Sequence, residues 1–248
     1  MNETATFWDH LDELRSVIIR SLVATVLFGT VAFCLKDWLF QVVLGPCQAD
    51  FPVYRLLGAE PFQLHLINTE LTEQFSAHLR VSVYAGLLLA SPYILYELFR
   101  FVSPGLYANE RRAGVWVVCS AYVMFVLGTV LNYLVMLPMT VRFLGTYQVS
   151  ADVDNMLTLR SYIDTFIMMS LALGAVFELP VVCAILGKMG FIDAGVMRRY
   201  RRHAIVAILV VAAIITPTTD VLSLLVVSVP IWLLYEISIF LVRNKTKN

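Results

Sequence analysis

The sequence predicts an all-α polytopic membrane protein with six transmembrane helices. Hydrophobic residues make up 59% of the 248 residues, and the mean hydropathy is +0.78. A soluble domain needs far less apolar surface to fill one core, so most of the chain is expected to face lipid. Apolar runs long enough to cross a hydrocarbon layer of ~30 Å recur along the chain. We read spans over residues 17–35, 81–99, 115–137, 166–189, 204–215 and 221–242.

The last two spans are expected to be short. Residues 204–215 would form a helix of about 18 Å, and the part of the last span that precedes Glu236 would measure about 22 Å. Neither crosses an average bilayer unstrained, so either the membrane thins here or the two segments form a re-entrant hairpin. We favour two short spans because no polar lining for a hairpin is visible.

The basic residues predict the orientation in the membrane. Most of the eighteen Lys and Arg residues fall in the terminal segments and in alternate loops, which the positive-inside rule assigns to the cytoplasm. Both termini are therefore expected inside, as an even number of spans requires. The Arg cluster at residues 198–202 is interpreted as a retention signal, with lipid headgroup contact as the alternative. Residues 1–13 are acidic where a cleavable signal peptide would be basic.

The segments outside the bilayer have distinct patterns. An amphipathic N-terminal segment over residues 3–15 is expected to lie at the inner interface. The outer loop begins with an apolar stretch that suits an interfacial helix, which Gly45 and Pro46 would end. We treat the chain as one membrane domain, 1–248. Its longer loops are expected over residues 36–78 on the outer side and over 97–114 and 190–203 on the inner side.

Prolines recur within or beside the spans, including Pro92 and Pro180. Kinked spans tend to enclose a concave face, which we expect here. The four histidines are scattered, no metal-ligand spacing is present, and no nucleophile stands beside a base. We therefore expect neither an enzyme nor a cofactor, and the net charge of zero gives no indication of nucleic-acid binding. A disulfide between Cys34 and Cys47 on the outer side is chemically permitted, and the sequence leaves it open.

Glu178 is the one carboxylate expected near the bilayer midplane, inside the apolar stretch 166–189. A charge at that depth costs roughly 2.5–3.5 kcal/mol on insertion scales, so the group is normally protonated, paired or directed at a polar cavity. Pro180 also leaves the Val176 carbonyl without its usual amide donor. The side chain is either a core carboxyl bonded to a neighbouring helix, or part of a polar notch that holds a partner helix or relays a proton.

Acidic residues on the basic inner side form a second candidate site. Asp12, Glu13 and Glu110 belong to this group. One interpretation is that they are helix-start acids favoured by the helix dipole, above all Asp12. The other is a receptor for a cationic ligand, because a carboxylate at headgroup level can take a guanidinium bidentately. At the outer side, Asp220 is expected to cap the last span after a tight turn.

In combination and in order, these motifs closely resemble the TatC family, the multispanning subunit of the twin-arginine protein translocase. The resemblance covers nearly the whole chain. The matching positions are His10–Arg15; Ser91 and Pro92; Phe101–Leu106 with Glu110, Arg111 and Arg112; Phe177–Pro180; and Thr216, Pro217 and Asp220.

The resemblance implies a function and a set of sites. The family exports folded proteins with the proton-motive force, reads the paired arginines of cargo signal peptides, recruits the single-span proteins TatA and TatB, and self-associates in the inner membrane of prokaryotes. By motif, Glu13 and Glu110 would bind the twin arginines, and Arg15 and Phe101 would shape that site. Glu178 and Thr216 would contact partner helices and the apolar part of the signal, while Pro46, Pro92, Pro180 and Asp220 would be structural kinks and turns.

Two positions depart from the family's pattern. Val17 stands where relatives commonly have a second basic residue, and Arg20, one turn later, is a possible replacement. Leu224 stands where many relatives have Gln at the presumed partner contact. The alternative function is a proton-coupled small-solute transporter that uses Glu178, but this function predicts internal repeats and further polar residues at the midplane, which we do not find in the sequence.

Overall fold

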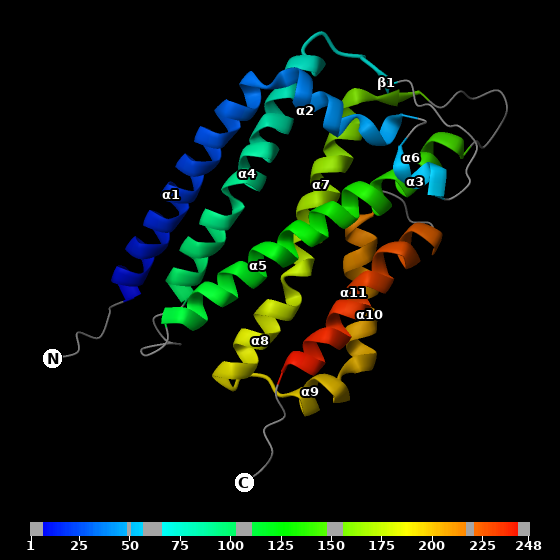
Figure 1. Ribbon diagram of the computed structural model, residues 1–248. Coiled ribbons are helices and arrows are strands. Elements are labelled where there is room, and N and C mark those ends of the chain that lie inside the picture. The colour runs from blue at the N-terminus through cyan, green and yellow to red at the C-terminus, as the bar shows by residue number, and fades with distance from the viewer. Residues whose placement is uncertain are drawn as a thin grey trace. The chain divides into compact units, whose positions relative to one another are not determined.

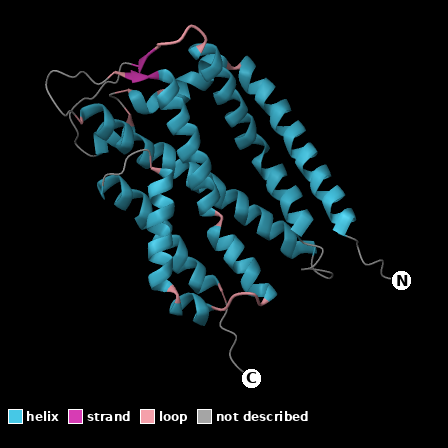
Figure 2. Ribbon diagram, turned by 180° about the vertical axis from the view of Figure 1, so that it is seen from behind, coloured by secondary structure: helices cyan, strands magenta, loops and turns pink. Residues whose placement is uncertain are grey.

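The protein is almost entirely helical in the computed structural model (Figures 1 and 2), which describes residues 7–48, 51–56, 66–102, 111–147, 156–216 and 221–242. Its only strands in these ranges, β1 and β2, pair in parallel over two residues each. The helices are α1 Phe7–Cys34, α2 Lys36–Val43, α3 Pro52–Leu56, α4 Glu73–Val102, α5 Arg111–Leu131, α6 Leu137–Thr146, α7 Leu159–Phe177, α8 Leu179–Met189, α9 Ala194–Arg199, α10 Arg201–Ile215 and α11 Val221–Leu241; β1 is Leu66–Ile67 and β2 is Leu157–Thr158.

Five stretches among the described residues are long and apolar enough to cross a membrane, which makes the chain a multi-pass membrane protein. They confirm five of the predicted spans. The sixth segment is helical as α10, whose 15 residues measure about 22 Å. The five stretches are His10–Cys34, Glu73–Phe101, Gly114–Thr146, Leu159–Met189 and Ser223–Leu241.

The helix ends differ from those expected. The predicted boundary between an interfacial segment and the first span is absent, because α1 runs without a break from Phe7 to Cys34. Its early residues lack any Gly or Pro that would end a helix, and an amphipathic turn continues readily into an apolar one. The α4 helix likewise begins at Glu73, before the predicted start of its span. The interfacial helix predicted from the apolar stretch after Lys36 is present as α2, which ends at Val43 before Gly45 and Pro46.

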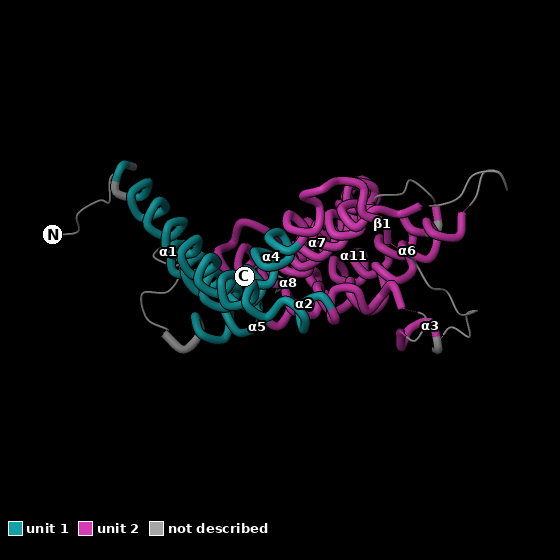
Figure 3. The backbone as a smooth tube through the Cα atoms, turned by 90° about the horizontal axis from the view of Figure 1, so that it is seen from above, with its two compact units in different colours: residues 1–40, 78–122 teal, residues 41–77, 123–248 magenta. Residues whose placement is uncertain are grey.

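The chain divides into two compact units (Figure 3). Unit 1 comprises residues 1–40 and 78–122, and unit 2 comprises residues 41–77 and 123–248. Unit 1 therefore contains α1, most of α4 and the first half of α5. Unit 2 contains α3, the strand pair, the second part of α5 and α6 to α11.

In unit 1, α1 and α4 lie side by side (Figure 1), and glycines bring their backbones into contact. A Cβ atom at Gly86 would lie 2.5 Å from both the Gly29 nitrogen and the Thr25 carbonyl oxygen. Close backbone approach at small residues is the usual way in which membrane helices gain packing energy, since lipid is as apolar as the side chains it would replace. A glycine is thus needed at position 86 because the α1 backbone leaves no room for a Cβ atom, and not because of an unusual backbone angle.

Aromatic stacking joins the same two helices near the end of α1. The His78 ring of α4 stacks on Phe33 of α1 with centroids 4.0 Å apart, and its Nε2 lies 3.1 Å from the Phe33 carbonyl oxygen. Pro92 lies inside α4, and the neighbouring Ser91 hydroxyl donates to the Leu88 carbonyl at 2.7 Å. A serine hydroxyl can in this way occupy a carbonyl close to a helix proline.

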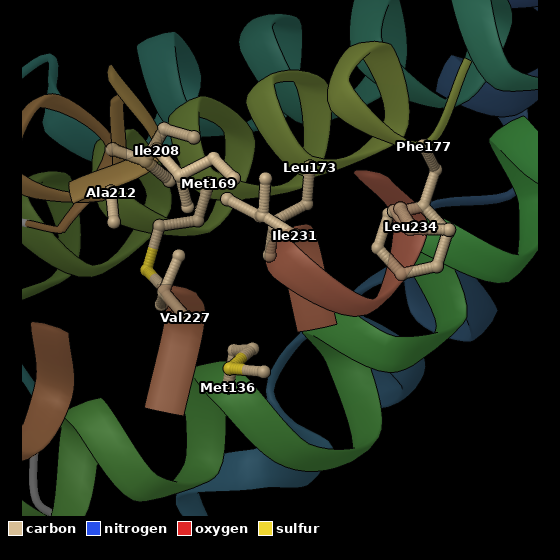
Figure 4. Packing of buried hydrophobic residues seen from close by; sticks show 10 residues of the cluster. Met136, Met169, Leu173, Phe177, Ile208, Ala212, Val227, Ile231 and Leu234 are labelled. Atoms are coloured by element: carbon tan, nitrogen blue, oxygen red, sulfur yellow. The ribbon is translucent and has the colours of Figure 1, made fainter. Parts of the chain in front are cut away.

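The core of unit 2 forms where α7, α10 and α11 meet. Side chains from these helices point toward one another in Figure 4, among them Met169, Leu173, Ile208 and Ile231. Gly128 of α5 packs on α7, because a Cβ there would lie 2.8 Å from the Leu173 carbonyl oxygen. The remaining members of the cluster are Met136, Phe177, Ala212, Ile215, Val227 and Leu234.

Tyrosine hydroxyls attach the segment between α2 and α3 to the helices of unit 2. Tyr54 donates to the carbonyls of Pro46 (2.8 Å) and Pro138 (3.2 Å), and Tyr162 donates to that of Val43 at 2.6 Å. Burial raises the pKa of the neighbouring Cys47 thiol to about 11, so this thiol stays protonated at neutral pH. All four cysteines are free. Pro46 lies in the short helical turn Gly45–Cys47, and its carbonyl accepts the Tyr54 hydrogen bond.

One buried carboxylate organises the start of two helices at this end. Glu73 accepts from the Thr69 amide at 2.8 Å and, with its other oxygen, from the Arg160 amide at 2.7 Å. The Arg160 guanidinium also pairs with Glu70 at 3.0 Å. The Arg160 amide is one of the first α7 donors, which have no partner within that helix, whereas the Thr69 amide lies in the segment that precedes α4. A single side chain thus connects these two segments. This arrangement keeps β1 beside β2.

Gly86→Ala is expected to lower the melting temperature of the purified protein, because the added methyl meets only backbone atoms of α1. Overpacking of this kind costs about 1–3 kcal/mol. Gly114→Ala is the matched control, since its Cβ would meet the Phe99 ring at 3.0 Å, and a ring can rotate away. Thermal unfolding followed by size-exclusion chromatography measures both. Equal melting temperatures for the two variants would contradict the backbone contact.

Candidate functional site

The N-terminal motif and the motif at the end of α4 meet in unit 1. His10 of α1 stacks on Phe101 of α4 with ring centroids 4.3 Å apart and an interplanar angle of 17°. The two residues are far apart in sequence, so their contact follows from the antiparallel packing of α1 on α4. Phe101 is half-buried, while His10 is exposed. Two of the segments singled out from the sequence therefore share one end of this unit.

Glu13 follows His10 by three residues and therefore lies on a neighbouring position of the same helix face. Its side chain is exposed, as is that of Arg15. Within the described side chains, no ion pair of Glu13 is present. Glu13 thus presents an accessible carboxylate one helical turn from the His10–Phe101 stack.

Glu110 lies outside the described residues, so its distance from Glu13 stays a prediction. The described chain resumes at Arg111, the first residue of α5. Gly114, one turn into that helix, packs against the Phe99 ring of α4, where a Cβ would lie 3.0 Å from the ring. The start of α5 therefore lies beside the same end of α4 that carries Phe101.

The sequence analysis missed an ion pair between α1 and α4. The Arg20 guanidinium lies 3.2 Å from the Glu97 carboxylate, whose side chain is only 4% exposed. Arg20 thus has a structural partner. If Arg20 also replaces the basic residue that is missing at Val17, it does so while it is bonded to Glu97. A carboxylate inside an otherwise apolar helix end was the signal that could have revealed the pair.

In unit 2, Glu178 lies at a break between two helices. The α7 helix ends at Phe177 and α8 begins at Leu179, with the buried Pro180 in its first turn. The expected kink at Pro180 is therefore a true interruption. The Glu178 amide donates to the Ala175 carbonyl at 3.1 Å, and its own carbonyl accepts from Val182 at 2.9 Å.

The Glu178 carboxyl contains a buried atom without a partner among the described residues. Its Oε1 atom is buried and has no hydrogen-bond partner among the described residues. An unpaired polar atom in an apolar environment is costly, so such a group either has a functional reason or binds a group that a single chain does not supply. The sequence left two interpretations open: a core carboxyl bonded to a neighbouring helix, and a polar notch that holds a partner helix or relays a proton. The described residues give the Oε1 atom no bond to a neighbouring helix.

Thr216 ends α10 and is buried, with 5% of its surface exposed. Its hydroxyl donates to the Ala212 carbonyl at 2.9 Å. This bond satisfies the hydroxyl within its own helix, next to the core cluster that contains Ala212 and Ile215. Pro217 and Asp220 lie outside the described residues, so the expected cap of the last span stays a prediction.

A second polar group inside unit 2 also escaped the sequence analysis. Asn132 is fully buried and opens a π-helical turn, Asn132–Met136, between α5 and α6. Its Nδ2 donates to the Ser170 hydroxyl of α7 at 2.7 Å, while Oδ1 has no partner in the described part of the chain. A lone Asn in the apolar run 115–137 was a visible signal. Within membranes such side chains commonly hydrogen-bond across helices.

The described residues contain no group of three or more His, Cys, Asp or Glu side chains that could hold a metal ion. Cys183 is half-buried against the cluster that includes Ile239, and Cys119 is exposed on α5. Neither thiol is part of the sites described above.

Comparison with known proteins assigns the family. The profile of the family described as "Sec-independent protein translocase protein (TatC)" matches residues 9–230. The chain belongs to the TatC family. It is 36% identical over 245 residues to the TatC protein of Koribacter versatilis, covering 98% of this chain and 88% of the relative. It is 34% identical over 240 residues to that of Deinococcus radiodurans, covering 97% and 86%.

Solved structures agree with this assignment. A crystal structure titled as the twin arginine translocase receptor TatC superposes with a TM-score of 0.76 at 32% identity, covering 94% of this chain and 97% of that one. A second, in the detergent DDM, gives a TM-score of 0.78 at 32% identity, covering 94% and 99%. The chain is thus a multi-pass TatC-type component of a protein translocase and not an enzyme, which leaves the small-solute transporter hypothesis without support.

Ser170→Ala is expected to lower the melting temperature, because it leaves the buried Asn132 amide without its acceptor. Hydrogen bonds between membrane helices contribute about 0.5–2 kcal/mol. The double variant Asn132→Leu/Ser170→Ala removes both polar groups and should recover most of the loss. Ser120→Ala, an exposed helix serine that bonds within its own helix, is the control. A double variant less stable than Ser170→Ala would show that the pair is not the relevant interaction.

Proposed function

We propose that this chain is the signal-peptide receptor and core component of a twin-arginine translocase. It binds the paired arginines of signal peptides and recruits TatA- and TatB-type single-span proteins for export of folded cargo driven by the proton-motive force. Membership of the TatC family and the similarity to crystal structures of the twin arginine translocase receptor TatC support this proposal. The membrane is the cytoplasmic membrane of a prokaryote.

The observation that carries the proposal is the convergence of two helix starts on the end of α4. His10 of α1 stacks on Phe101, and Gly114 of α5 packs on Phe99. Glu13 lies one turn after His10, and Glu110 precedes Gly114 by about one turn in sequence. Both carboxylates would therefore flank the same helix end, where two adjacent arginines of one peptide reach them together.

The chemistry of the two groups suits an arginine ligand. A carboxylate accepts both arms of a guanidinium, and each such pair contributes about 1.5–3 kcal/mol when partly desolvated. Lysine offers a point charge without this planar geometry, so arginine is preferred. Arg15 and Phe101 shape the site, since the ring of Phe101 gives it an apolar wall and Arg15 limits its net negative charge.

The orientation follows from the distribution of basic residues. The exposed Arg198, Arg199 and Arg202 lie on α9 and α10, in a loop that we place in the cytoplasm with both termini. With α10 as a sixth span, the termini share that side. The short length of α10 supports local thinning of the bilayer, which would ease the passage of a folded protein.

Glu178 is the proposed contact for partner helices within the membrane. Its buried Oε1 lacks a partner in the described part of this chain, so a polar side chain of a partner helix would satisfy it. Thr216 would lie at the edge of this contact, and a second copy of the chain would assemble in the same complex. The receptor site for arginine and the contact for partners are thus carried by different units.

Glu110→Arg is expected to abolish crosslinking of a twin-arginine signal peptide while the protein stays inserted, because a cation would replace an acceptor. Glu13→Gln should weaken the same crosslink at least about tenfold through loss of one charged hydrogen-bonded pair. Asp12→Asn is the matched control, since Asp12 is interpreted as a helix-start acid. Photo-crosslinking in membrane vesicles measures all three, and an unchanged crosslink for Glu110→Arg would remove the receptor claim.

Glu178→Ala is expected to preserve peptide crosslinking and to reduce assembly with partner subunits. The change removes the unpaired acceptor without touching unit 1, so arginine recognition should stay within about twofold of the unaltered protein. Native gel electrophoresis of the complex and a transport assay report on assembly. Equal loss of recognition and assembly would instead indicate misfolding and contradict the separation of the two sites.

A further inference from the structure

The most buried charged side chain in described unit 1 is not among the residues that the family motif assigns. The Glu97 side chain is 4% exposed and lies on α4 one turn before Phe101. Arg20, which lies 3.2 Å away on α1, is half-exposed, and Tyr93 interacts with the same carboxylate through its hydroxyl. A buried carboxylate stays charged only with a partner of this kind. The pair therefore demands that α1 and α4 keep one relative position.

The Arg20–Glu97 pair lies close to the proposed receptor site in the order of contacts along α1 and α4. Contacts between α1 and α4 follow a regular antiparallel order within unit 1, and Glu13 lies between the Arg20–Glu97 pair and the His10–Phe101 stack. From the end of α1 to its start, the contacts are Phe33–His78, Gly29–Gly86, Arg20–Glu97 and His10–Phe101. The two contacts nearest the site thus lie on either side of its carboxylate.

A directional bond selects one rotation of α1 on α4, which apolar packing does only weakly. Lipid and side chains are similarly apolar, so burial alone discriminates weakly between rotations of one membrane helix on another. A guanidinium–carboxylate bond has defined geometry and is lost when a helix rotates. Rotation of α1 by one residue, about 100°, would turn Glu13 away from Phe101. The His10–Phe101 stack and the Arg20–Glu97 ion pair lie on either side of Glu13 and both resist such rotation, and of the two only the ion pair joins opposite charges.

We propose that Arg20 and Glu97 are positioning residues that fix the rotation of α1 on α4 and thereby direct the Glu13 carboxylate toward the signal peptide. This inference rests on the proposed receptor function. Neither residue needs to touch the peptide. Arg20 also neutralises Glu97, so the peptide arginines meet the carboxylates of Glu13 and Glu110 and not a third one.

The test measures binding of a fluorescent synthetic twin-arginine signal peptide to the full-length protein in lipid nanodiscs. Arg20→Met and Glu97→Leu alone should each weaken binding about tenfold or more. The charge swap Arg20→Glu/Glu97→Arg should restore binding to within about threefold, because the bond reforms with its ends exchanged. Melting temperature and size-exclusion profile establish that each variant is folded.

The apolar pair Arg20→Met/Glu97→Leu separates positioning from simple stability. Replacement of both partners by apolar residues of similar size generally preserves folding. This variant should melt like the unaltered protein and yet bind the peptide about tenfold more weakly, since it lacks a directional bond. Binding at the unaltered level by the apolar pair, or by the folded single variants, would overturn the proposal.

Two further results keep the interpretation specific. A swapped variant that folds and does not bind would mean that Glu97 contacts the peptide directly, which contradicts a positioning role; Arg20→Lys, which keeps the charge and can replace the single N–O contact, should bind within about threefold and serves if the swap does not fold. Glu13→Gln in the same assay tests the underlying receptor function. If Glu13→Gln binds normally, the receptor proposal fails; if it binds weakly and the pair variants bind normally, only this inference fails.

Discussion

The packing of α1 on α4 is the constraint on which the proposed receptor site depends. In lipid, no general hydrophobic force selects one arrangement of two apolar helices, so close backbone approach and a few polar or aromatic contacts select it. Gly86 allows the backbones to meet, and the ion pair and ring stack determine how α1 is rotated. Glu13 and Phe101 can belong to one site only because these contacts hold.

In unit 2, the buried polar side chains of Asn132 and Glu178 differ in whether they have a hydrogen-bond partner within the described chain. Asn132 finds Ser170 within the chain, whereas the buried Oε1 of Glu178 has no described partner. Both groups lie in helices interrupted at that point, by a π turn in one case and by Pro180 in the other. Interrupted helices at membrane depth are tolerated where the freed polar groups are buried in protein. We infer that Asn132 serves the fold of this chain and Glu178 serves its assembly.

The apolar runs located the helices correctly because a membrane span needs about 20 apolar residues, and that length is visible in sequence. Helix ends were less predictable: α1 begins at Phe7 and α4 at Glu73, since polar helical turns outside the lipid leave no gap in the helix. Glu97 and Asn132 were visible as polar residues in apolar stretches, but their partners Arg20 and Ser170 are far away in sequence, so the pairing itself required a structure. The candidate carboxylates were visible in the sequence, as acids on a basic side or within an apolar span, and the family motif gave them roles. Their surroundings required a structure.

The proposed receptor site requires that Glu13 and Glu110 lie close enough for two neighbouring arginines to reach both. Cysteines introduced at these two positions in a chain free of other cysteines test this directly, with a bifunctional thiol reagent no longer than two arginine side chains. We expect an intramolecular bridge in the monomer that an added twin-arginine peptide suppresses. Efficient single labelling at both positions without any bridge would contradict it.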